Sequence, residues 1–326
     1  MPASAKPDVA RAWSDLSRPI LDAINVELSS FCNRNCFYCL NSRFPAYRKG
    51  FMSDMLIDRL VEEVDSSVKI VLCGFGEPSL HPFFPDILRR LCRHFPRLSV
   101  VTNGHLFEDS DLLRRTLASG IPKINLSLDY IEPERYRHAK KAELSSVLDG
   151  IRRFVDLRNR SRSRTFLQIN YLIEVGKSDY LYAFHLLDKI ISEYWCMYLT
   201  CMKNLAGQVK VITPNKAMLP DFPPEAIASQ KVLIEDWEQY LANTNFVRDR
   251  PKICRHLYRY FVLRHNGDVV PCFFDQLSTM VVCNVTSDRM NLAQVLQCEK
   301  YHELRCRQAH QDLSLCTDCT DHYKYT

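Results

Sequence analysis

Three cysteines near the start of the chain constrain it more than any other feature. They are Cys32, Cys36 and Cys39, which share one short segment with the spacing C-x3-C-x2-C. Thiolate is the ligand that proteins offer to iron–sulfur clusters, and three thiolates can hold three irons of a cubane while the fourth iron stays without a protein ligand. A zinc site usually needs a fourth ligand and two separated cysteine pairs. The polar residues 33–35 interrupt any apolar face, which argues against three core cysteines.

The cysteine content of the whole chain points the same way. The 326 residues include 14 cysteines, and the first twenty residues carry charges at Lys6, Asp8 and Arg11 instead of an apolar segment. We therefore expect no signal peptide, a cytoplasmic location, and metal binding in place of a disulfide framework. The net charge of +5 is too small to indicate nucleic acid as a partner, and no run is long and apolar enough to indicate a membrane span.

Hydrophobic patterning predicts alternating strands and helices over the first two thirds of the chain. The predicted strands cover 24–28, 68–73, 98–102, 123–128, 165–175 and 195–201, and the predicted helices cover 53–65, 82–95, 109–119, 143–158 and 178–193. This order predicts an α/β fold with a partial (β/α)6 TIM-type barrel, in which ligands bind at the carboxyl ends of the strands.

The alternation stops near residue 212, where four prolines between 214 and 224 mark a linker. We therefore predict three parts. They are an N-terminal extension over 1–22, a core domain over 23–213, and a linker with a small cysteine-rich domain over 214–326.

A second motif follows the second predicted strand. The run Cys73-Gly-Phe-Gly76-Glu77-Pro78 places a carboxylate beside glycines, which let the backbone approach a ligand closely. By itself, an ordinary strand-to-helix turn explains the run. One βα unit after the cysteine segment, it resembles the Gly-Glu-Pro motif of the radical S-adenosylmethionine (radical SAM) enzymes, in which an aromatic such as Tyr38 also precedes the last cysteine. Phe75 stands where many members have glycine, and the resemblance covers residues 24–320.

This resemblance implies that the three cysteines hold a [4Fe-4S] cluster whose open iron chelates SAM. The further SAM contacts that it implies are Tyr38, Gly76, Glu77, Pro78, Asn103, Ser127, Asp129 and Arg137. Lys140 and Lys141 lie in the same basic loop as Arg137, so the group that reaches the methionine carboxylate stays open among the three. Without the resemblance, the polar strand ends are ordinary loop residues and the basic loop is solvated surface.

The resemblance also implies a reaction type. A flavodoxin- or ferredoxin-type partner supplies one electron, SAM is cleaved, and the 5′-deoxyadenosyl radical removes a hydrogen atom from a substrate. In such enzymes the cofactor carries the chemistry, and the protein supplies position and a water-poor cavity.

A second set of cysteines lies near the end of the chain. Cys254 and Cys272 flank a predicted hairpin with the turn Asn266-Gly267, and Cys316 and Cys319 form a C-x2-C pair. Four thiolates suit a fully ligated iron–sulfur cluster and a structural zinc equally. The pattern resembles the auxiliary-cluster domains called SPASM and twitch, and the twitch form with one auxiliary [4Fe-4S] cluster fits better. Full ligation implies that this cluster relays or accepts electrons.

The resemblance extends to the radical SAM dehydrogenases and epimerases of aminoglycoside pathways. It implies hydrogen abstraction from a natural-product precursor, either an aminosugar or aminocyclitol or a peptide, with dehydrogenation or epimerisation as the outcome. Epimerisation needs a thiol that returns a hydrogen atom, and the candidates are Cys201, at the expected end of the sixth strand, and Cys73. The alternatives are a peptide-crosslinking maturase that forms thioether or carbon–carbon bonds, an activase that makes a glycyl radical, and a non-catalytic metal-binding interaction protein.

Overall fold

The computed structural model describes residues 19–36, 39, 41, 49–173, 179–191, 193–205, 208–212, 232–233, 254, 256–273, 275, 278–310 and 312–313. Tyr38, Cys316 and Cys319 therefore lie outside the described residues, as do residues 1–18 of the predicted extension. For Cys201 the backbone is described and the side chain is not.

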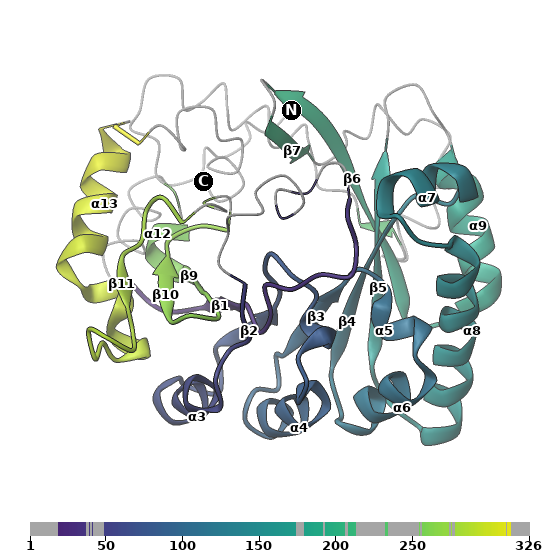
Figure 1. The fold of residues 1–326 in the computed structure, drawn as a ribbon, viewed down its shortest axis with the longest axis horizontal. Helices are drawn as coiled ribbons and strands as arrows, with labels where there is room; N and C mark the ends of the chain where they lie inside the picture. Colours follow the sequence, from purple (N-terminus) through teal and green to yellow (C-terminus); the bar gives the residue numbers. More distant parts are fainter. Residues whose placement is uncertain are drawn as a thin grey trace, which may run out of the picture.

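Six parallel strands form the centre of the sheet in chain order. They are β1 (Ala23–Val26), β2 (Lys69–Leu72), β3 (Ser99–Thr102), β4 (Lys123–Asp129), β5 (Phe166–Ile173) and β6 (Trp195–Leu205). Each strand pairs in parallel with the next one along the chain. The predicted α/β fold with a six-stranded partial barrel is confirmed. Because the six strands are parallel, their carboxyl ends lie at the same edge of the sheet (Figure 1).

The helices between the strands cover one face of the sheet (Figure 1). The longer ones are α3 (Asp54–Glu63), α4 (Phe84–His94), α6 (Ser110–Ala118), α8 (Leu144–Ser161) and α9 (Asp179–Ile191), and the short ones are η1 (Pro78–Leu80), α5 (His105–Glu108) and α7 (Pro133–Lys140). Among the residues that the structure describes, no helix has the length and apolar character that crossing a membrane requires.

Strand alternation sorts the side chains between the two faces. Ile24 and Val26 of β1 join helix residues such as Leu60 and Leu91 in the main hydrophobic core. The residues between them on each strand point away from the helices, because successive side chains of a strand alternate. That second face carries the polar groups considered below.

The sixth strand is longer than the sequence predicts. Cys201 pairs with Ile173 and with Ile212 and does not end the strand, because β6 continues to Leu205 and returns as the antiparallel strand β7 (Gln208–Ile212). The expected position of Cys201 at a strand end is therefore wrong. A short strand, β8 (Val232–Leu233), also pairs in parallel with β6.

The cysteine-rich segment extends the same sheet on its other side. Strand β9 (Tyr260–Leu263) pairs in parallel with β1, and β10 (Asp268–Val270) and β11 (Cys283–Asn284) continue in antiparallel order. The helices described in this segment are α12 (His256–Arg259), η3 (Leu292–Gln297) and α13 (Glu299–Ala309). The predicted hairpin is confirmed, and it forms an edge of the barrel sheet (Figure 1). The predicted boundary at 213/214 stays a prediction, since residues 213–231 lie outside the described ones.

Candidate active site

The cysteine segment begins directly after β1, at the carboxyl edge of the parallel sheet. Ser30 fixes its start, because Ser30 N donates to Gly50 O (3.0 Å) and Gly50 N donates to Ser30 Oγ (2.7 Å). Farther along, Cys39 N donates to Cys36 O at 3.0 Å, so these two cysteines share one turn. The Ser30–Gly50 bonds thus hold together the two ends of the stretch that carries the cysteines.

Asn103, which follows β3, reaches the first of these cysteines. Its Nδ2 donates to Cys32 Sγ at 3.3 Å, and the backbone N of Arg34 donates to the same sulfur at 3.4 Å. Burial raises the pKa of the Cys32 thiol, and these two donors oppose that shift. Donors around a sulfur favour the thiolate, which is the form that binds iron.

Within the described residues no three His, Cys, Asp or Glu side chains are already grouped around a metal position. Three sulfur ligands in one short segment still match the donor set of an iron–sulfur cluster, and metal binding itself completes such sites. The chemistry of the donors and the Asn103 contact therefore fit a cluster at this segment.

Glu77, which follows β2, is buried, and several hydrogen-bond donors surround its carboxylate. Its Oε1 accepts from Ser79 N (3.2 Å), Ser79 Oγ (2.6 Å) and Thr102 Oγ1 (2.9 Å), and its Oε2 accepts from Asn103 N (2.7 Å). Each carboxylate oxygen has two lone pairs. Among the described residues Oε2 accepts one bond, which leaves room for a further donor such as an ammonium group.

Gly76 lies where the second motif touches the cysteine segment. A Cβ at this position would stand 2.2 Å from Phe31 O and 2.4 Å from Ser29 O, and Glu77 N donates to Phe31 O at 2.8 Å. No side chain fits at such distances, so glycine is required for the two segments to make contact.

Asp129 and Lys140 form a buried ion pair at the end of β4. The backbone of Asp129 has φ +68, in the left-handed region that Asp tolerates better than most residues, and the pairing of β4 with β5 shifts register between Ser127 and Asp129. Burial alone would lower the pKa of Lys140, but the Asp129 carboxylate and the nearby Cys36 sulfur raise it above its ordinary value. Lys140 therefore carries its charge next to the cysteine segment.

Arg137 lies elsewhere. Its side chain is about half exposed and binds Glu143 through Nε (2.7 Å) and Nη2 (2.9 Å). The structure brings Lys140, and not Arg137, to Asp129 and Cys36. Of the three basic residues that the sequence left open, Lys140 is the one that the structure pairs with Asp129 beside Cys36.

A buried cluster that the sequence reasoning missed joins β1 to the cysteine-rich segment. Glu27 is fully buried; its Oε1 lies 2.8 Å from His265 Nδ1, and its Oε2 accepts from Arg264 Nη1 (3.2 Å) and Phe75 N (2.9 Å). Burial raises the pKa of Glu27, but the His265 hydrogen bond and the Arg264 charge outweigh this and hold it below its ordinary value. The sequence offered one signal, an acidic residue at the end of an apolar strand.

Two of the four predicted auxiliary ligands fall within the described residues. Cys254 is buried, and Cys272 lies just beyond β10. Burial is the main cause that raises the pKa of Tyr301 far above its ordinary value, and both cysteines lie near enough to add to it. That these two cysteines share one site with Cys316 and Cys319 stays a prediction, since the latter two lie outside the described residues.

The two candidate hydrogen donors differ in what the structure says of them. Cys73 follows β2, and burial raises its pKa to about 12, with the Arg264 guanidinium opposing and the Glu27 carboxylate adding to the shift. It is therefore a neutral thiol near pH 7. Cys201 is placed only by its backbone in β6.

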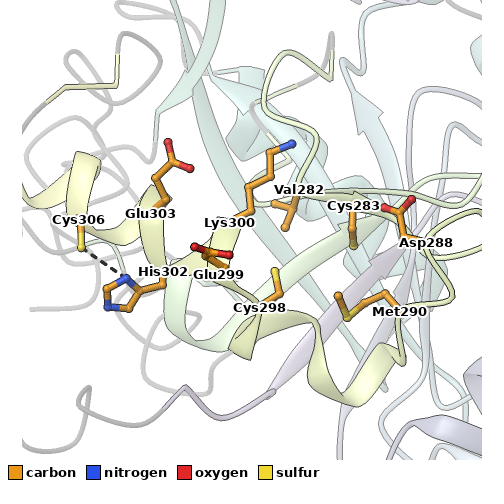
Figure 2. Close-up of a pocket in the computed structure, with 10 residues that line it drawn as sticks. All are labelled: Val282, Cys283, Asp288, Met290, Cys298, Glu299, Lys300, His302, Glu303 and Cys306. Carbon is orange, nitrogen blue, oxygen red and sulfur yellow. Dashed lines mark hydrogen bonds between the residues drawn. The ribbon is translucent and has the colours of Figure 1, made fainter.

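An open pocket of about 700 Å³ lies in the cysteine-rich segment, between α13 and the stretch of chain around β11 (Figure 2). Cys283, Cys298 and Cys306 line it, and Cys306 Sγ lies 3.8 Å from His302 Nδ1. None of the predicted site residues contributes to its walls.

Two family models match the sequence. The model of the Radical SAM superfamily matches residues 26–186, and the model of the SPASM iron–sulfur cluster-binding domain matches residues 254–320. The first range includes the cysteine segment and the Gly-Glu-Pro motif, and the second includes all four predicted auxiliary ligands.

Several curated relatives share the name Probable GTP 3′,8-cyclase. The protein of Methanococcus vannielii is 24% identical over 297 residues, 87% of this chain and 96% of its own length. The protein of Methanocaldococcus jannaschii is 26% identical over 153 residues, 46% of this chain and 49% of the relative. That of Methanosarcina mazei is 33% identical over 142 residues, 41% of each chain. For the last two, the match spans half of the relative's length or less.

Solved structures of similar fold are more distant in sequence. SuiB of Streptococcus suis bound to S-adenosylmethionine has a TM-score of 0.67 at 13% identity, with 96% of this chain and 75% of that chain covered. The structure named native anSMEcpe with bound AdoMet has a TM-score of 0.62 at 17% identity and covers 91% of this chain and 86% of that one. At identities this low, the structural likeness shows a shared fold and nothing about function.

Proposed function

Because this chain belongs to the radical SAM superfamily and carries a SPASM iron–sulfur cluster-binding domain, we propose that it starts its reaction by removing a hydrogen atom from a polar substrate. When bound, a [4Fe-4S] cluster and SAM supply the one-electron chemistry that makes the 5′-deoxyadenosyl radical. The observation that carries this proposal is Asn103, whose backbone bonds Glu77 (2.7 Å) and whose side chain bonds Cys32 (3.3 Å). One residue thus joins the first cluster ligand to the SAM motif.

The surrounding residues have roles that follow from their charges. Glu77 Oε2, which accepts from Asn103 N, would also accept from the methionine ammonium, and Lys140, held charged by Asp129, would bind the methionine carboxylate. Ser127 lies near the same strand end as Asp129 and would contact the ribose, as the family resemblance implies. These roles are proposals that SAM binding by the single variants tests.

The substrate is proposed to be polar because of the face of the sheet turned away from the helices. Lys123 Nζ donates to Gln168 Oε1 (2.7 Å) near the amino ends of β4 and β5, and Gln168 Nε2 donates to Asn170 Oδ1 (2.7 Å), which lies farther toward the carboxyl end of β5. Ile124 and Ile169, the neighbours in sequence, point into the helix-facing core instead. Because ligands bind at the carboxyl ends of the strands, Asn170 is the member of this row nearest to a substrate, and its amide suits hydroxyl, amine or peptide groups better than a hydrocarbon.

Two outcomes stay within this proposal, dehydrogenation and epimerisation of a natural-product precursor. Dehydrogenation uses the auxiliary cluster at Cys254, Cys272, Cys316 and Cys319 as acceptor of the second electron. Epimerisation needs a neutral thiol, and burial keeps Cys73 in that form. Cys73→Ala and Cys201→Ala separate the outcomes, because loss of an epimerised product with continued 5′-deoxyadenosine release would assign the hydrogen donor. Crosslinking of a peptide remains the alternative outcome.

A second candidate function is cyclisation of a purine nucleotide. It is favoured by the Methanococcus vannielii relative, named Probable GTP 3′,8-cyclase, which this chain matches over 96% of its length. The four predicted auxiliary thiolates argue against cyclisation. They would ligate all four irons of the auxiliary cluster, so no iron would be open to bind the nucleotide. Incubation with SAM, reductant and GTP tests it, and GTP-dependent release of 5′-deoxyadenosine together with a cyclised nucleotide product would support the cyclase candidate.

The proposal includes a flavodoxin- or ferredoxin-type electron donor and a cytoplasmic setting, both of which rest on the cysteine content and the family resemblance. The test is anaerobic reconstitution followed by an assay of 5′-deoxyadenosine with SAM and dithionite. Formation that ceases in Cys32→Ala supports the proposal. Bound zinc without sulfide would support the non-catalytic alternative instead.

A further inference from the structure

The Glu27 cluster connects three segments that are far apart in sequence. Its members are nearly inaccessible, with side-chain exposures of 0% for Glu27, 3% for Arg264 and 5% for His265. Glu27 directly follows β1, and the two basic residues lie in the turn between β9 and β10. A buried carboxylate with two basic partners is expensive to leave incomplete, so the three side chains hold one relative position.

On one side the Glu27 cluster of side chains contacts the Gly-Glu-Pro motif (the SAM motif, residues 73–78). Glu27 Oε2 accepts from Phe75 N at 2.9 Å, and the Arg264 guanidinium stacks over the Phe75 ring at 4.9 Å. A Cβ at Gly74 would stand 2.5 Å from Glu27 Cγ, so the motif backbone lies directly against the carboxylate side chain. Phe75 stands where many members of the family have glycine, and in this chain its ring packs against the Arg264 guanidinium.

On the other side the Glu27 cluster of side chains contacts the segment that carries Cys272, a predicted auxiliary ligand. Arg264 Nη2 donates to Asp275 O (2.9 Å), and Asp275 N donates to Cys272 O (3.1 Å). His265 meanwhile packs on Gly50, where a Cβ would stand 2.7 Å from the imidazole Cδ2. The path from Cys272 to Phe75 therefore runs through one backbone hydrogen bond and the Arg264 side chain.

We propose that Glu27 and Arg264 are positioning residues that couple ligation at Cys272 to SAM binding at the Gly-Glu-Pro motif. When Cys272 is ligated, the 272–275 segment is fixed, Arg264 is fixed through Asp275, and Glu27 and Phe75 keep the SAM motif in its binding position. The inference rests on the proposed function, since it takes SAM and an auxiliary metal as the ligands of the two sites.

Arg59 gives a matched control. It also joins the core to the cysteine-rich segment, since Nη1 donates to Val285 O (2.6 Å) and Nη2 donates to Met290 O (2.7 Å), but it comes from α3 and contacts neither the SAM motif nor the Cys272 segment. Arg59→Gln therefore loosens the same docking without breaking the proposed path.

The test is a double-mutant cycle read by SAM affinity. Dissociation constants for SAM are measured by equilibrium dialysis on the full reconstituted chain, without reductant, for wild type, Cys272→Ala, Glu27→Gln and the double variant, and again with Arg59→Gln in place of Glu27→Gln. Iron content is measured on each sample, so that loss of the first cluster is not mistaken for loss of affinity.

We expect Cys272→Ala to weaken SAM binding about tenfold in the wild-type and Arg59→Gln backgrounds, and to have no further effect in Glu27→Gln. If Cys272→Ala weakens SAM binding by the same factor in all three backgrounds, or does not weaken it in wild type, the inference is overturned. If Glu27→Gln does not fold, Arg264→Lys replaces it, because that variant keeps a positive charge beside Glu27 but loses the guanidinium that bonds Asp275 O and stacks on Phe75. A wild-type chain that binds no SAM overturns the proposed function itself.

Discussion

Two buried ion pairs flank the cysteine segment, Glu27 with Arg264 and Asp129 with Lys140. Both carboxylates stand at strand ends on the edge where the segment lies. A buried charge persists only where partner charges and hydrogen bonds replace water. The sequence shows the acids at these ends, but the base that meets each one depends on how a turn or a short helix folds, and in the case of Arg264 on residues more than 200 positions away.

The basic loop gives a matched pair of variants. Lys140→Met leaves the buried Asp129 carboxylate without its partner and is expected to destabilise the chain by about 3–5 kcal/mol and to weaken SAM binding. Arg137→Met removes an exposed pair and is expected to change neither. Urea unfolding and SAM dialysis of both variants check this, and equal effects from the two would contradict the placement of Lys140.

The same pair predicts a pH profile. The pKa of Lys140 lies above its ordinary value of 10.5, because the charge of Asp129 outweighs the effect of burial. A raised folded pKa gives stabilisation that is complete below the unfolded pKa and is lost as pH rises through the folded one. The stability difference between wild type and Lys140→Met should therefore stay constant from about pH 6 to about pH 9. A difference that shrinks steadily over this interval would refute the assignment.

At the scale of elements, the six predicted strands and five longer helices follow from hydrophobic spacing alone. The ends agree within a few residues for helices such as α3 (Asp54–Glu63), where Ser53 Oγ accepts from Leu56 N (3.4 Å) and marks the start. The short helices α5 and α7 were missed because four to eight residues carry little periodicity. Pairing of β9 with β1 was missed because alternation predicts a strand and not its neighbour.

The contact between the SAM motif and the cysteine segment makes a prediction at this scale. Gly76→Ala places a Cβ 2.2 Å from Phe31 O and must push the two segments apart. We expect reduced iron at the first cluster and loss of SAM binding. Gly120→Ala is the control, since its φ of +78 makes alanine cost about 1 kcal/mol while no atom lies within 4 Å of the new Cβ. Normal iron loading in Gly76→Ala would show that the contact is dispensable.

At the scale of the whole molecule, the cysteine-rich segment is an edge of the barrel sheet and shares its main hydrophobic core. Phe261 and Leu263 of β9 pack with Ile24 and Val26 of β1 in that core. The hairpin that Cys254 and Cys272 flank is therefore joined directly to β1, the strand that leads into the first cysteine segment. Spacing singled out the two cysteine sets, and for the second set it left an iron–sulfur cluster and a structural zinc equally open. The joining of the two segments depends on a strand pairing across more than 200 residues, which spacing does not predict.

Metal content distinguishes the two sites. Cys272→Ala is expected to lose about four of about eight irons per chain and to keep the cluster at Cys32. Cys32→Ala is expected to lose the other four and to keep the auxiliary set. Iron and sulfide analysis with EPR of the reduced proteins measures this. Loss of all iron from either single variant would contradict two independent clusters.

The central claim is tested most directly by the release of 5′-deoxyadenosine from SAM after anaerobic reconstitution, with dithionite as reductant and wild type beside Cys32→Ala. The account predicts 5′-deoxyadenosine from the wild-type chain, with about eight irons bound, and none from the variant. A reconstituted wild-type chain that binds its clusters and never cleaves SAM, or that holds zinc without sulfide, would contradict the account.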